Sequence, residues 1–95
     1  MLDDIKQYLR VTHNLDDEML NGLILTAKQL IVEKTGIEYK EGDGAYLMLI
    51  RFLVAHFYEN REAVGEKAMS EMPYTIQHLM VHIALRGEYD QQGQV

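Results

Sequence analysis

The segment at positions 45–58, AYLMLIRFLVAHFY, limits the possible folds of this chain more than any other feature. Its residues are apolar or aromatic except for Arg51 and His56. Wound into a helix at about 3.6 residues per turn, the segment is apolar on every side. A chain of 95 residues has few other elements that can cover such a helix. We therefore expect other copies of the chain, or a different partner, to shield part of it.

Both sides of this helix carry large apolar side chains. One side is formed by Ala45, Leu49, Phe52, Leu53 and His56. The opposite side is formed by Leu47, Val54 and Tyr58, with Arg51 among them. His56 lies on an apolar side, which predicts a buried, hydrogen-bonded imidazole in the core.

A second predicted helix also has apolar residues outside its main face. Leu25 and Val32 lie seven positions apart, nearly opposite that face. Taken alone they are compatible with scattered surface aliphatics. Together with the strip around positions 45–58 they predict a subunit interface, formed by Leu25, Val32, Leu47, Arg51, Val54 and Tyr58. Arg51 then needs a carboxylate partner, which a neighbouring subunit could supply, because an unpaired buried charge is costly.

The periodicity predicts an all-α fold, a small bundle of two long helices over about 16–35 and 44–61 and two shorter ones over about 3–10 and 75–85. Asp16 and Asp43 are suitable N-caps for the long helices, and Gly36 is a suitable C-cap for the first. Residues 62–73 are expected to form a loop. Gly87 is expected to end the last helix, giving one domain over 1–87 and a flexible polar tail over 88–95.

Composition and charge exclude several classes of function. The net charge is −6, and the nine basic residues are scattered rather than gathered into a stripe that would bind phosphates. The 45–58 segment is shorter than the roughly 20 apolar residues that cross a bilayer, so we expect no membrane association. The first ten residues, MLDDIKQYLR, lack the pattern of a secretory signal.

No residue pattern predicts catalysis. His78 and His82 are four positions apart, as in helical metal sites, but Leu79 replaces the glutamate of the usual hydrolase motif. Two solvent-exposed imidazoles explain this pair better than a metal does. Ser70, the single serine, lies in the predicted loop without a nucleophile-elbow pattern. We expect no enzyme activity, no cofactor and no metal.

Several segments, in order along the chain, resemble the small bacteriophage head–tail connector proteins, also described as head-completion, adaptor or possible DNA-packaging proteins. LDDIKQYLRVTHNLDDEML at 2–20 is similar to that family's opening, and LVAHFYENREAV at 53–64 to its most recognisable motif. MPYTIQHLM at 72–80 and ALRG at 84–87 resemble the start and end of its last helix. The matching motif residues are Tyr58, Glu59, Asn60, Arg61, Pro73, Leu85, Arg86 and Gly87. The loop at 65–71, GEKAMSE, has no counterpart that we can match.

This resemblance implies a structural virion protein that is made in the bacterial host cytoplasm. It implies a homo-oligomeric ring of about a dozen copies beneath the portal protein, following the portal's cyclic symmetry. Such a ring extends the channel through which genomic DNA passes without sequence-specific binding, and offers a docking surface to a tail-side connector or tail-completion protein. Arg61 is expected to pair with a carboxylate, and Arg86 with the tail is expected to reach a neighbouring subunit or the portal.

The sequence leaves a different reading open. A small helical interaction module, such as a phage-encoded regulator, could bind a host protein through the same apolar strip. Both readings require exposed apolar surface on a folded subunit.

Overall fold

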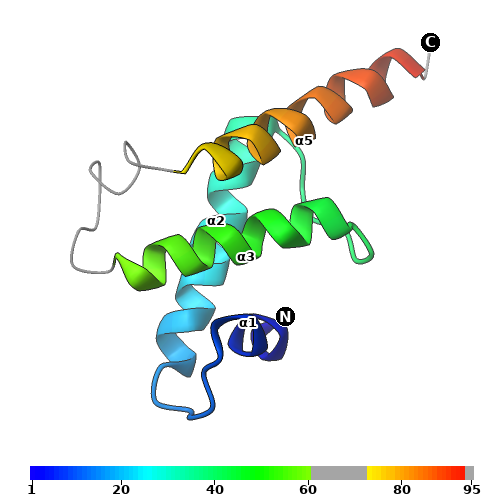
Figure 1. Ribbon diagram of the computed structural model, residues 1–95. Coiled ribbons are helices and arrows are strands. Elements are labelled where there is room, and N and C mark those ends of the chain that lie inside the picture. Colours follow the sequence, from blue (N-terminus) through cyan, green and yellow to red (C-terminus); the bar gives the residue numbers. More distant parts are fainter. Residues whose placement is uncertain (61–72, 94–95) are drawn as a thin grey trace.

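The computed structural model describes the backbone of residues 1–60 and 73–93 and, within these ranges, the side chains up to residue 86. The described residues form four helices and no strand, which confirms the all-α prediction (Figure 1). The helices are α1 (Leu2–Leu9), α2 (Asp17–Thr35), α3 (Gly44–Glu59) and α5 (Tyr74–Gly93). None of the helices in these ranges is long and apolar enough to cross a bilayer.

Helix α3 lies in front of α2 and crosses it, and it packs against all the other described helices (Figure 1). Helix α5 lies on one side of α3 and also contacts α2, whereas α1 lies on the other side of α3 and packs against α2 and α3. Contact from several directions is what a helix that is apolar all round requires.

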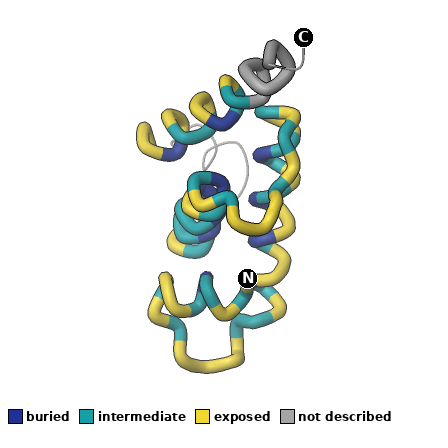
Figure 2. Tube along the Cα trace, turned by 90° about the vertical axis from the view of Figure 1, so that its right-hand side faces the viewer, coloured by how far each residue is buried: buried dark blue, intermediate teal, exposed yellow. Residues whose placement is uncertain are grey.

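The core occupies the space between α2, α3 and α5, with a contribution from α1. Figure 2 shows that the buried positions face this space, whereas the outer edges of α2 and α5 are exposed. The buried core residues are Ile5, Leu20, Ile24, Ala27, Ile31, Tyr46, Leu49, Ile50, Leu53, Val54, Ile76 and Ile83.

Two expectations about α3 are wrong. Val54, expected in a subunit interface, is fully buried in the core of its own protomer. His56, expected in the core, is only half-buried. The physical reason is that α1, α2 and α5 pack on α3 from different directions. The buried residues of α3 therefore include Val54 as well as Leu49, and His56 lies outside them. The protomer thus covers much of the apolar surface that the sequence assigned to other copies.

The predicted caps are present at two helix ends. The Asp43 Oδ1 accepts a hydrogen bond of 3.2 Å from the backbone N–H of Tyr46, in the first turn of α3. Gly36 ends α2 in the left-handed conformation, with φ of 74°, and its N–H donates to the carbonyl of Val32. Asp16 occupies the N-cap position of α2, but its side chain makes no cap hydrogen bond.

The last helix is longer than predicted. It starts at Tyr74 and continues through Gly87 to Gly93. A single glycine inside a helix costs only about 1 kcal/mol relative to alanine. The glutamate and glutamines that follow are good helix formers, which explains why the predicted stop at Gly87 was wrong. The predicted loop at 62–73 lies almost entirely outside the described residues.

Candidate functional site

Arg51, predicted to lie in a subunit interface, is paired within its own protomer. Its guanidinium donates two hydrogen bonds to Asp4, with Nε 2.7 Å from Oδ1 and an Nη nitrogen 2.6 Å from Oδ2. Hydrogen bonding to Arg51 lowers the pKa of the Asp4 carboxyl below its ordinary value of 3.8. The pair ties α1 to the middle of α3, so Arg51 needs no carboxylate from a neighbouring subunit.

Tyr58 also has a role inside the protomer. Its hydroxyl donates a 2.7 Å hydrogen bond to Oδ2 of Asp16, at the start of α2. Asp16 was predicted to cap α2, but its carboxylate accepts this hydrogen bond from Tyr58 and makes no cap hydrogen bond. With Val54 buried and Arg51 paired, half of the six predicted interface residues stabilise the protomer instead.

Leu25 is the predicted interface residue that is clearly available, with 60% of its surface exposed. Val32 and Leu47 are half-buried. Leu25 lies on the exposed side of α2. Lys28 and Val32 follow it along the helix and are partly buried, and they line a surface hollow together with Gln29, Glu33 and Glu38. The Lys28 ammonium lies 5.5 Å from the centre of the Tyr39 ring, a cation–π contact. We name Leu25, Lys28 and Val32 the α2 ridge.

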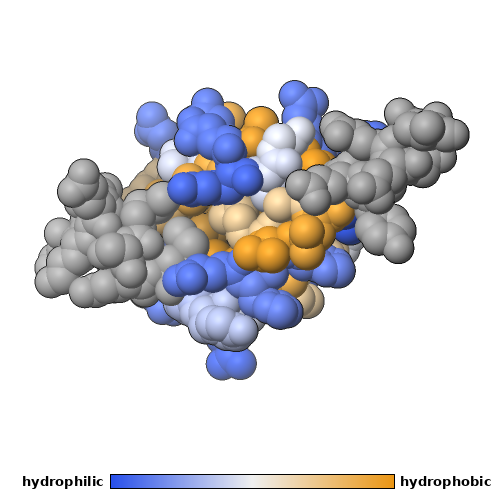
Figure 3. Space-filling model, turned by 90° about the horizontal axis from the view of Figure 1, so that it is seen from above, coloured by the Kyte–Doolittle hydropathy of each residue, from blue (hydrophilic) through white to orange (hydrophobic). Residues whose placement is uncertain are grey.

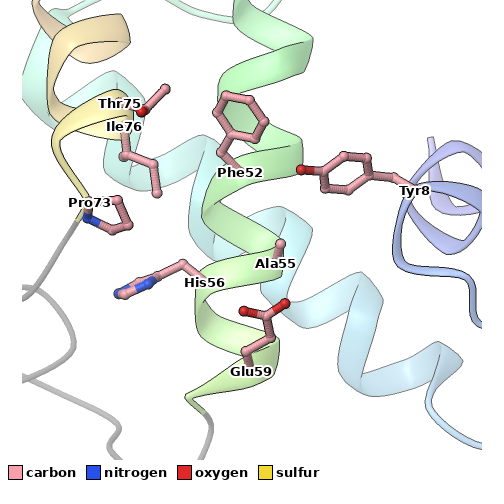
Figure 4. A pocket seen from close by; sticks show the side chains of 8 residues that line it. All are labelled: Tyr8, Phe52, Ala55, His56, Glu59, Pro73, Thr75 and Ile76. Carbon is pink, nitrogen blue, oxygen red and sulfur yellow. The ribbon is translucent and has the colours of Figure 1, made fainter.

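A surface groove of about 310 Å³ lies between α1, α3 and the start of α5 (Figure 4). It is lined by Tyr8, Phe52, Ala55, His56, Glu59, Pro73, Thr75 and Ile76. The Tyr8 ring stands at one side of the groove, with its centroid 6.2 Å from that of the Phe52 ring. In Figure 4, α2 runs behind α3, on the far side from the groove. We name this feature the α3 groove; sequence reasoning missed it because its residues come from three separated helices.

Helix α5 has an apolar stripe on the side opposite its buried residues. Tyr74, Val81 and Leu85 are 79%, 56% and 55% exposed, whereas Ile76 and Ile83 are buried. Figure 3, which views the molecule from the α5 side, shows apolar surface open to solvent between polar patches. The stripe (Tyr74, Val81 and Leu85, the α5 stripe) was missed, although spacings of seven and four residues could have indicated it.

The remaining described motif residues lie at the end of α3, directly before α5 and within α5. Glu59 and Asn60 are exposed, and the Asn60 side-chain amide donates to the His56 carbonyl at 2.8 Å, next to the end of the helix. Pro73 directly precedes α5, and its carbonyl accepts backbone hydrogen bonds from the first turn of that helix. Gly87 lies within α5, and Arg61 is outside the described residues.

Arg86 was expected to reach a neighbour or the portal. In the structure its guanidinium instead donates two hydrogen bonds to the Asp43 carboxylate, at 3.1 and 2.7 Å. Hydrogen bonding to Arg86 lowers the pKa of Asp43, and the bond from the Tyr46 backbone acts in the same direction. This contact fastens α5 to the start of α3.

The histidines do not form a chemical centre in the described part of the chain. His78 and His82 are both exposed, and the His78 ring stacks on Tyr74 at 5.9 Å between centroids. Among the described residues, no group of three or more histidines, cysteines or acids could hold a metal ion. The exposed apolar side chains of the α2 ridge, the α3 groove and the α5 stripe are suited to contacts with other proteins.

Comparison with known proteins identifies the family. No curated protein and no solved structure matches the chain. The family model described as "Phage gp6-like head-tail connector protein" matches residues 1–83, which is most of the chain. The chain therefore belongs to the phage gp6-like head–tail connector family, whose members are structural components of the virion.

Proposed function

We propose that this connector assembles into a ring beneath the portal, extends the DNA channel and offers a docking surface to the next connector or tail component. The observation that carries the proposal is the pair of surfaces on opposite sides of one protomer, the α2 ridge and the α3 groove. A closed ring needs two different, complementary surfaces on each subunit, because its interface is heterologous.

The α5 stripe supports the docking part of the proposal. It lies on a third side of the protomer and exposes a tyrosine and two aliphatic residues. A ring built through the α2 ridge and the α3 groove leaves this stripe available. Aromatic residues are enriched at protein interfaces, and exposed apolar patches commonly mark them. The portal above the ring, or a tail-side protein below it, is the expected partner.

The net charge of −6 suits a protein past which DNA moves without being held. Binding of duplex DNA depends on the release of counterions by lysine and arginine at phosphates. Two of the arginines in the described residues, Arg51 and Arg86, are paired with carboxylates of the same protomer. Genomic DNA is therefore expected to pass through the ring without sequence-specific binding.

Electron microscopy of purified portal assemblies, from the same phage genome, mixed with this protein tests the proposal. We expect an added ring of density on one face of the portal. Leu25→Ser should keep the melting temperature of the free protein and prevent the ring, because the side chain contributes little to the monomer core. Leu15→Ser, the same change at a position 88% exposed in the turn before α2, is the matched control.

A folded wild-type protein that leaves portals bare would contradict the proposal. A monomeric state of the free protein does not decide it, since the portal can template assembly. Capture of one host protein together with failure to bind portals would favour the alternative of a regulatory module.

A further inference from the structure

We propose that the α2 ridge of one copy inserts into the α3 groove of the next copy, with Lys28 of the first facing Glu59 of the second. This inference rests on the proposed ring and specifies its interface. The occupant of the groove is thus a second copy of this chain.

The groove has the shape and chemistry to receive an aliphatic ridge. Phe52 and Ala55 form its floor on α3, and the Tyr8 ring and Ile76 lie on either side of it (Figure 4). Glu59 lies one helical turn beyond Ala55, at the end of the groove, and is exposed. The groove therefore presents an apolar centre with a carboxylate at one end.

The ridge presents the complementary pattern in the same order. Leu25 comes first, and Lys28 follows within one turn, which is about 5 Å along a helix. Ala55 and Glu59 are separated by a similar rise on α3. When Leu25 of one copy lies on the apolar floor of the next copy's groove, the Lys28 side chain is long enough to reach the carboxylate at the end of the groove.

Charge favours this pairing over a different partner. Among the described residues, neither Lys28 nor Glu59 takes part in an ion pair, whereas the Asp4–Arg51, Asp17–Lys6 and Asp43–Arg86 pairs are satisfied within the protomer. The Lys28 ammonium is held near the ridge by its contact with the Tyr39 ring. Complementary charges set the register of an interface and oppose wrong pairings.

The α2 ridge and the α3 groove are placed so that copies of the chain can assemble head to tail. Figures 1 and 2 agree that α3 lies on one side of α2, and Figure 2 shows the outer edge of α2 exposed on the other side. A ridge and a groove on opposite sides produce a head-to-tail contact, which closes into a ring or continues as a filament. A contact of two ridges would instead stop at a dimer.

Disulfide trapping tests the contact directly, because the chain contains no cysteine. Leu25→Cys and Ala55→Cys proteins are purified separately, mixed at equal concentration and oxidised. We expect a mixed disulfide dimer to form faster than either like-with-like dimer. Leu15→Cys mixed with Ala55→Cys is the matched control and should form dimers only at the slow rate of random collision.

The proposed ion pair predicts a second result. Lys28→Glu or Glu59→Lys alone should lower the trapping rate by about two- to fivefold, as expected for one exposed pair. A chain that carries both changes restores opposite charges between neighbours and should recover most of the rate. Both single variants are expected to stay folded, because within the described residues neither side chain forms an ion pair and Lys28 gives up only its contact with the Tyr39 ring.

The outcomes separate this inference from the proposed function. Faster trapping of Leu25→Cys with itself, or no trapping above the control, overturns the ridge-in-groove contact. If portals still acquire a ring in that case, the connector function stands and its interface lies elsewhere. Trapping that succeeds while portals stay bare supports the contact and contradicts the proposed position beneath the portal.

Discussion

Arg86 and Asp43, which are 43 positions apart in the chain, form a two-point ion pair that joins the last helix to the start of α3. The same Asp43 carboxylate caps α3 through the backbone N–H of Tyr46. One side chain thus starts a helix and fixes the position of another. The loss of Asp43 should affect both.

Substitution of Asp43 separates these two roles. Asp43→Ala removes the cap, which costs about 1 kcal/mol, and also removes the partner of Arg86. Asp43→Asn keeps a capping oxygen and loses the charge, so it should be less destabilising than Asp43→Ala. Urea unfolding measures both free energies. Equal losses for the two variants would show that the cap contributes nothing.

Acid should destabilise the protein through Asp4 and Asp43. The folded-state pKa of each is lowered below 3.8, mainly by hydrogen bonds from Arg51 and Arg86. A carboxyl with a lowered folded-state pKa contributes stability that is complete above its unfolded-state pKa and is lost as the pH falls through the folded-state value. The stability that these two groups contribute should therefore be complete and independent of pH near neutrality, and should be lost progressively below about pH 4.

Thermal unfolding between pH 2 and pH 7 checks this dependence. A variant with Asp4→Asn and Asp43→Asn should start less stable at pH 7 and lose less stability in acid. A variant that follows the wild-type curve with an unchanged slope would assign the acid sensitivity to other carboxyls.

The hydroxyl of Tyr58 should stabilise the junction of α2 and α3. Tyr58→Phe removes its 2.7 Å hydrogen bond to Asp16 and should cost about 1 kcal/mol. Tyr39→Phe is the control, because within the described residues the Tyr39 hydroxyl makes no hydrogen bond. Chemical denaturation should show a lower free energy of unfolding for Tyr58→Phe only. An equal loss for both variants would show that the Tyr58–Asp16 hydrogen bond does not stabilise the protein.

Two exposed glycines should respond to alanine in opposite directions. Gly22 lies within α2 with no atom near an added Cβ, so Gly22→Ala should stabilise the protein by about 0.5–1 kcal/mol. Gly36 has equal space but a φ of 74°, so Gly36→Ala should destabilise it by about 1–2 kcal/mol. Melting temperatures of the two variants measure this difference directly.

The local features of this protein could be predicted from its sequence. Helix type and most boundaries follow from periodicity over a few turns, and the caps at Asp43 and Gly36 follow from residue chemistry at helix ends. These signals depend on neighbours in the chain. The end of α5 was misjudged because one unfavourable residue, Gly87, does not outweigh the favourable residues that follow.

Only the tertiary structure decided which apolar side chains stay exposed. Val54 and Leu25 look equally surplus in the sequence, but Val54 is buried between helices and Leu25 faces solvent. Arg51 and Arg86 have carboxylate partners 47 and 43 positions away, and Tyr8 meets Phe52 across two helices. The sequence alone determines that the chain is helical, because helix signals are local. Tertiary packing decides which faces of the protein remain exposed to binding partners, because burial depends on residues far apart in the chain.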